Sequence, residues 1–150
     1  MCTSNDNIKL ADFGNTVDIK EILNQNIKNN KISYEDCTCL HNTFTGTPHF
    51  MSPEILIGKK YGRGVDIWAL GCTIIEMFTG KPPWYDLNPF SLILKMGSKQ
   101  LPEYVLPDDV SLDARDFLKR AMCFEYEKRA TANELLYHNF ALFIADDEEF

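Results

Sequence analysis

The stretch from Val65 to Thr79 constrains the fold more than any other part of the chain. Its apolar residues do not keep to one stripe, and at 3.6 residues per turn they cover nearly the whole circumference of a helix. Asp66 stands in the first turn, where a negative charge stabilises a helix, and Gly80 followed by Pro82 ends it. Fifteen residues carrying two carboxylates are too short and too charged for a membrane span. We therefore expect a central core helix over residues 65–79 that is buried on all sides.

The composition fits one globular domain, because 150 residues with 45% hydrophobic residues can fill a single core. The net charge of −7 argues against a nucleic-acid or anionic-membrane surface. The N-terminus has neither a basic region nor an apolar run, so we expect no secretory signal, a cytoplasmic location and reduced cysteines. Cys37, Cys39 and His41 resemble metal ligands, but no second Cys/His cluster completes a zinc site, so we expect an ordinary loop.

The beginning of the chain predicts little regular structure. A short strand is expected at residues 8–10, directly before Asp12-Phe13-Gly14. Residues 15–45 show no lasting period and many asparagines, which indicates a solvated insertion. Within it, residues 17–23 fit a strand and a short helix equally well. At the other end, residues 144–150 are expected to form a solvated acidic tail.

Helix-capping patterns place the helices on either side of the central one. Ser52 before Pro53 predicts a short helix, since Ser is a good N-cap and Pro is tolerated at the first helical position. After the central helix, either Asn88 or Asp86 can cap a helix that ends before Gly97.

Two further capping patterns lie in the last third of the chain. Ser111 begins a helix that continues through Met122, and its apolar side is expected to include Leu112. Thr131 and Glu134 form a capping box before another short helix. Beyond residue 14 the chain is therefore expected to consist of helices and loops.

Three motifs stand in a fixed order: Asp12-Phe13-Gly14, then Gly46-Thr47-Pro48 with Ser52-Pro53-Glu54, then Asp66-x-Trp68-x-x-Gly71. In this order they resemble the C-terminal lobe of a eukaryotic serine/threonine protein kinase over residues 8–143. Residues 106–118 and the Arg129-Ala-Thr-Ala sequence are similar to mitogen-activated kinase kinase kinases. The resemblance implies a mainly α fold: a kinase-like C-terminal lobe around the helix at 65–79, with a short β remnant near residues 8–10. Residues 1–143 would be a partial kinase domain.

The resemblance assigns active-site roles to five residues. Asp12 would hold the Mg²⁺ that bridges the ATP phosphates, a task that needs a hard anionic oxygen ligand. Thr43 and Thr45 occupy activation-loop phosphorylation positions. Thr47 and Pro48 would face the substrate residue next to the acceptor hydroxyl.

The resemblance gives structural roles to a further set of residues: Phe13, Gly14, Glu54, Asp66 and Arg129. Phe13 would pack beneath the metal ligand and set whether its carboxylate points inward. Glu54 and Arg129 would form the buried ion pair that anchors the end of the activation segment. Asp66 would accept hydrogen bonds from the backbone of the catalytic loop.

The catalytic loop itself, His-Arg-Asp-x-x-x-x-Asn, is not among the 150 residues. Its Asp belongs roughly eighteen residues before Asp12, which falls ahead of the first residue. No catalytic base is therefore expected in this chain, and the chain alone is expected to be inactive. The intact parent would use ATP and Mg²⁺ to phosphorylate protein Ser or Thr residues in a mitogen-activated kinase cascade.

The partners that the resemblance implies are a protein substrate, such as a downstream kinase, and an upstream activating kinase. Neither nucleic acid nor membrane is expected as a partner. The alternative is a non-catalytic interaction module derived from a kinase lobe. An upstream coding segment that supplies the catalytic loop would distinguish the enzyme from the module.

Overall fold

The computed structural model describes residues 9–11, 13–16, 46–59 and 61–142. The chain divides into two units, residues 1–37 and 38–150, and each is described by itself. In the first unit, the described residues form one 3-10 turn, η1 (Phe13–Asn15).

The strand expected at residues 8–10 is not formed at Lys9 and Leu10, and Ile8 lies outside the described residues.

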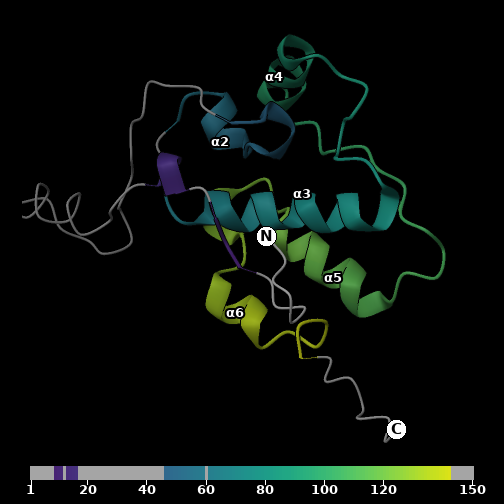
Figure 1. The fold of residues 1–150 in the computed structure, drawn as a ribbon. Coiled ribbons are helices and arrows are strands. Elements are labelled where there is room, and N and C mark those ends of the chain that lie inside the picture. Colours follow the sequence, from purple (N-terminus) through teal and green to yellow (C-terminus); the bar gives the residue numbers. More distant parts are fainter. Residues whose placement is uncertain (1–8, 12, 17–45, 60, 143–150) are drawn as a thin grey trace, which may run out of the picture. The chain divides into compact units, whose positions relative to one another are not determined.

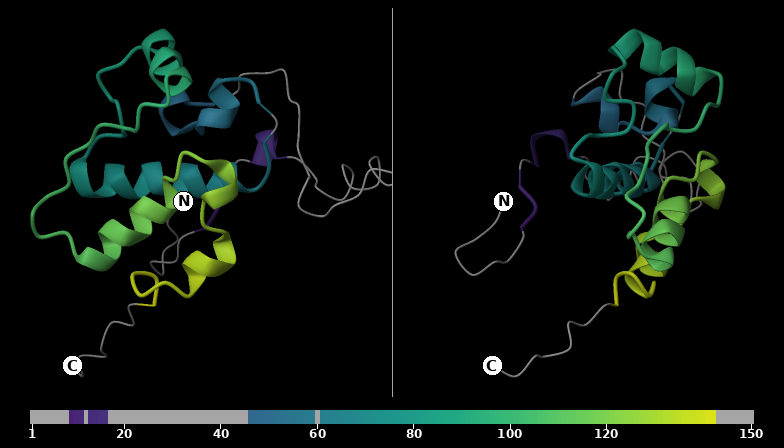
Figure 2. Two further views of the ribbon diagram at one scale, coloured as in Figure 1. Left: turned by 180° about the vertical axis from the view of Figure 1, so that it is seen from behind. Right: turned by 90° about the vertical axis from the view of Figure 1, so that its right-hand side faces the viewer.

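The second unit is built from helices, and the mainly α fold expected from the sequence is confirmed. In chain order they are η2 (Pro48–Phe50), α2 (Pro53–Leu56), α3 (Gly64–Thr79), α4 (Pro89–Gly97), α5 (Leu112–Ala121), η3 (Tyr126–Lys128) and α6 (Ala132–Leu136). Figure 1 shows α3 across the middle of this unit, with α2 and α4 on one side and α5 and α6 on the other. The two views in Figure 2 keep this arrangement.

Helix α3 contributes to both apolar clusters of the second unit. Trp68, Cys72 and Ile75 are fully buried and pack with apolar side chains of α4 and α5. Burial raises the pKa of the Cys72 thiol to about 12, so this residue is an uncharged part of the core. In the second cluster, Ile67 packs with Phe117 of α5 and a leucine of α6.

One face of α3 is exposed, so the expectation that this helix is buried on all sides is wrong. Asp66, Leu70, Thr73 and Met77 follow one another at intervals of four, three and four residues, which places them on one side of the helix. Met77 is 77% exposed. The elements described in this unit cover the sides of α3 that face α4 and α5, and they leave this exposed stripe uncovered.

Most helix ends follow the signals in the sequence. Gly80 ends α3 in the left-handed conformation, with φ at 73°. The side chains of Asn88 and Ser111 cap α4 and α5, each accepting a hydrogen bond from a backbone N–H three residues on. Thr131 and Glu134 form both hydrogen bonds of the capping box at the start of α6.

One predicted cap forms without its side-chain hydrogen bond, and one expectation about burial is wrong. Ser52 is the N-cap residue of α2, but its hydroxyl makes no capping hydrogen bond, because the N–H of Ile55 bonds to the Ser52 carbonyl instead. Leu112 is 84% exposed rather than part of the buried side of α5. That side repeats at intervals of three, one and three residues: Ala114, Phe117, Leu118 and Ala121.

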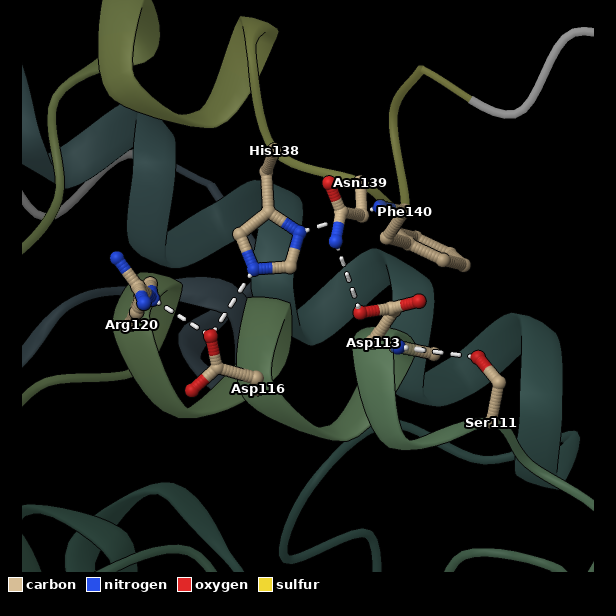
Figure 3. A network of polar contacts seen from close by, with 8 residues as sticks. Ser111, Asp113, Asp116, Arg120, His138, Asn139 and Phe140 are labelled. Carbon is tan, nitrogen blue, oxygen red and sulfur yellow. Dashed lines mark hydrogen bonds and ion pairs between the residues drawn. The ribbon is translucent and has the colours of Figure 1, made fainter.

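The turn after α6 is fastened to α5 by the polar network in Figure 3. His138 Nδ1 accepts from the backbone N–H of Phe140 at 3.2 Å, so Nε2 carries the proton and donates to the Asp116 carboxylate at 3.0 Å. Arg120 donates to the same carboxylate oxygen at 2.7 Å. The pKa of Asp116 is lowered mainly by the hydrogen bond from His138 and, to a smaller extent, by the hydrogen bond from Arg120. This network holds Phe140 edge-on against Phe117, 5.2 Å between ring centroids.

Gly71 lets α3 and α5 approach closely. A Cβ atom at this position would lie 2.6 Å from the sulfur of Met122 and 3.4 Å from the methyl group of Ala121. The distance to Met122 is too short for a side chain to tolerate without displacement, whereas the distance to Ala121 is at the lower edge of ordinary contact. Packing against Met122 therefore favours glycine at this position of the Asp66-x-Trp68-x-x-Gly71 motif.

We expect Gly71→Ala to lower the free energy of unfolding by about 1–3 kcal/mol, because the methyl group forces the Met122 side chain out of its place in the core. Gly97→Ala is the matched control. Gly97 is the last residue of α4, and a Cβ atom at this position would face open space, with no neighbouring atom within 4 Å. The control should leave stability unchanged or raise it slightly, since Ala favours helix over Gly. Denaturant unfolding measures both, and equal effects of the two substitutions would contradict this packing role.

Candidate functional site

The segment from Gly46 to Glu54 forms a compact turn followed by a helix. Gly46 has φ at 118°, a conformation that side chains rarely adopt. The N–H of Phe50 bonds to the carbonyl of Thr47, and the next N–H bonds to the carbonyl of Pro48. Thr47 is exposed, whereas Glu54 in the first turn of α2 is buried. The segment therefore presents Thr47 at the surface while its far end is anchored inside.

A buried ion pair anchors that far end. Arg129 donates two hydrogen bonds to the Glu54 carboxylate, from Nη1 to Oε1 at 2.6 Å and from Nη2 to Oε2 at 3.0 Å. The Arg129 side chain is fully inaccessible to solvent, and that of Glu54 is 6% exposed. The planar guanidinium fits this two-point contact in a way that an ammonium group cannot.

Two backbone carbonyls satisfy further donors of Arg129. Its Nη1 also donates to the carbonyl of Gly64 at 2.9 Å, and its Nε donates to the carbonyl of Cys123 at 2.9 Å. The guanidinium carbon lies over the ring of Trp68 at 5.1 Å and over that of Tyr126 at 5.7 Å. One side chain thus joins α2, the start of α3 and the loop between α5 and η3.

A second long-range contact reaches this segment through His49. Its Nε2 lies 3.1 Å from the carbonyl oxygen of Leu87, in the loop between α3 and α4. Sequence reasoning missed this contact, as it missed the carbonyls of Gly64 and Cys123. Only the position of His49 directly after Thr47-Pro48 could have drawn attention to it.

The structure describes only some of the residues that the sequence assigns to the active site. Asp12, Thr43 and Thr45 lie outside the described residues, as do the cysteines and histidine at positions 37, 39 and 41. Phe13 is 65% exposed in η1, in the first unit. In the parts that the structure describes, no three His, Cys, Asp or Glu side chains gather as a metal site. Binding of Mg²⁺ by the Asp12 carboxylate therefore stays a prediction from the sequence.

Asp66 lies at the start of the exposed stripe of α3 and accepts no hydrogen bond from the described residues. Part of its side chain is exposed, but the surrounding protein partly desolvates the carboxyl group and raises its pKa. The role that the kinase resemblance implies for Asp66, accepting hydrogen bonds from the catalytic-loop backbone, stays a prediction.

None of the helices within residues 46–59 and 61–142 is long and apolar enough to cross a membrane. The longest, α3, carries Asp66 and Glu76 and ends at Thr79.

We expect Arg129→Ala to lower the free energy of unfolding by roughly 3–5 kcal/mol, because it leaves the buried Glu54 carboxylate without a partner. Arg129→Lys should cost less but remain clearly destabilising, since Lys cannot form the two-point contact. Arg63→Ala, which removes an exposed arginine directly before α3, is the matched control and should change the melting temperature little. If the melting curves of all three variants coincide with that of wild type, the Glu54–Arg129 pair does not stabilise the fold and this prediction is wrong.

Comparison with known proteins identifies the family. The protein kinase domain family matches residues 1–141. The chain is 39% identical over 139 residues to human mitogen-activated protein kinase kinase kinase 3, which covers 90% of this chain and 19% of that protein. It is 40% identical over 130 residues to a probable serine/threonine-protein kinase of Dictyostelium discoideum, covering 87% of this chain and 18% of the relative.

The serine/threonine-protein kinase CST20 of Candida albicans is 37% identical over 134 residues, covering 89% of this chain and 10% of the relative. The chain thus spans about a fifth or less of the length of these relatives. The family match, however, extends over nearly the whole chain and includes all three motifs. This chain belongs to the protein kinase family, and its relatives are serine/threonine kinases.

Proposed function

We propose that this chain is part of the catalytic domain of a serine/threonine protein kinase, and that the intact protein transfers the γ-phosphate of ATP to Ser or Thr residues of a protein substrate. The observation that carries the proposal is the buried pair of Glu54 and Arg129, which holds the end of the Gly46–Glu54 segment in the core. A segment that must position a substrate requires such an anchor, because catalysis of phosphoryl transfer consists largely of positioning and charge stabilisation.

Thr47 and Pro48 would contact the substrate in this scheme. Thr47 is exposed, and Pro48 begins η2 with its φ fixed by the ring. Met51, three residues after Pro48, is buried in the core. An exposed turn that is held in the core by a buried residue can bind the substrate residue next to the acceptor hydroxyl and so orient that hydroxyl.

Asp12 would hold Mg²⁺ between the ATP phosphates, and the metal would neutralise the charge that develops on the transferred group. Thr43 and Thr45 would be the switch. Phosphate on either residue adds nearly two negative charges, which can order a loop by pairing with an arginine of the catalytic loop. An upstream kinase would add this phosphate, and a downstream kinase in a mitogen-activated cascade would be the substrate.

We expect Asp12→Ala in the full-length protein to reduce phosphorylation of a protein substrate at least about 100-fold, because Asp12 is the one carboxylate of the Asp-Phe-Gly motif and its loss would remove the proposed metal ligand. Asp108→Ala is the matched control: Asp108 is an exposed carboxylate in the turn before α5, and its loss should leave activity intact. Melting temperatures confirm that both variants are folded.

Two outcomes of this assay would contradict the proposal. An Asp12→Ala variant that retains wild-type activity would remove Asp12 from the metal site. A folded full-length protein that turns over no ATP would instead favour the non-catalytic interaction module.

A further inference from the structure

The hydrogen bond between His49 and Leu87 joins two segments that are 38 residues apart. The Leu87 carbonyl can only accept, so His49 Nε2 carries a proton and donates across the 3.1 Å contact. The contact is half-buried, which shields it from competition with water. It is the direct polar connection that the structure describes between the Thr47–Phe50 turn and the loop before α4.

The acceptor end of this bond is held rigidly. The N–H of Leu87 bonds to the carbonyl of Trp84 at 2.9 Å and closes a tight turn. Trp84 is 6% exposed and has φ at 55°, a conformation that is costly for a bulky residue unless packing fixes it. The next residue, Asn88, caps α4 through its contact with the N–H of Ser91 at 2.9 Å. The Leu87 carbonyl is therefore a fixed point at the entrance to α4.

The donor end belongs to the turn that would face the substrate. His49 is the middle residue of η2 and directly follows Thr47 and Pro48. Helix η2 contacts both α3 and α4, and the following Met51 is buried. Glu54 anchors this segment only five residues further on, through Arg129. The His49 bond supplies a second anchor, much closer to the exposed Thr47.

We propose that His49 is a positioning residue that fixes the Thr47–Pro48 turn against the entrance of α4 and thereby sets the preference for the substrate residue next to the acceptor hydroxyl. This inference rests on the proposed kinase function. His49 acts through its two neighbours and touches no reacting group. Its loss should therefore affect peptide recognition and leave ATP recognition unchanged.

Three substitutions separate this role from a general contribution to stability. His49→Ala removes the donor. His49→Gln keeps an N–H donor at about the reach of Nε2, whereas His49→Asn places its donor closer to the backbone, where it cannot reach the Leu87 carbonyl. Gln and Asn are alike in polarity, so a difference between them reports on the hydrogen bond itself.

The test uses the full-length protein and a set of peptides that differ only in the residue next to the acceptor Ser or Thr. His49→Ala and His49→Asn should raise KM for the preferred peptide about 3- to 10-fold, the size expected for one hydrogen bond. In both variants, kcat/KM should also differ less from one peptide to another than it does in wild type. KM for ATP should stay at the wild-type value, and His49→Gln should resemble wild type in every measurement.

Amide hydrogen exchange of residues 47–50 and 84–88 gives a second readout that needs no activity. Faster exchange in the Ala and Asn variants, together with wild-type exchange in the Gln variant, supports the anchoring role of His49. This readout holds even if the wild-type protein phosphorylates no peptide. Absence of peptide phosphorylation would contradict only the proposed kinase function. Active protein in which all three variants match wild type in peptide preference and exchange would overturn the inference while the kinase function stands. Equal losses of peptide and ATP recognition in all three variants would also overturn it.

Discussion

The buried ion pair of Glu54 and Arg129 is the interaction on which the described structure depends. Removing two charges from water costs several kcal/mol per ion, so such a pair persists only when its geometry is good and its remaining donors are satisfied. Both conditions hold here, because the guanidinium makes two hydrogen bonds to the carboxylate and two more to backbone carbonyls. The network holds α2 beside the start of α3 and the loop after α5.

The same anchor connects the core to the surface on which the proposed function depends. Helix α2 is only four residues long, too short to be stable without tertiary contacts. Glu54 supplies such a contact, and Pro53 and Leu56 are buried beside it. The turn before α2 is therefore held by two contacts, the Glu54–Arg129 ion pair and the hydrogen bond from His49 to the Leu87 carbonyl. Positioning of this kind is what phosphoryl transfer demands of a protein.

The sequence predicted the helices well because their signals are local. The caps at Asn88, Ser111 and Thr131 formed, since each needs only a side chain and a backbone N–H three residues on. The errors arose where burial depends on the elements that pack against a helix. The apolar residues of α3 indicate which sides of this helix could be buried. The elements packed against α3 determine which sides are in fact buried, and Met77 remains exposed.

Prediction of the site was limited in the same way. The resemblance to protein kinases implied that Glu54 and Arg129 would pair, but the carbonyls of Gly64 and Cys123 carry no sequence signal, because every residue has a carbonyl. Leu112 looked like part of the apolar side of α5, whereas the three- and four-residue spacing from Phe117 and Leu118 leads to Ala114 instead. Asp12, Thr43 and Thr45 remain predictions from the sequence.

A double-mutant cycle on Glu54 and Arg129 tests the central claim most directly. Glu54→Ala, Arg129→Ala and the double variant are compared with wild type by denaturant unfolding of the full-length protein. Each single substitution leaves an unpaired buried charge, whereas the double variant leaves none, so the two effects should be strongly non-additive, with a coupling energy of at least about 2 kcal/mol. Effects that add to within about 0.5 kcal/mol would show that the two side chains act independently and would contradict the account.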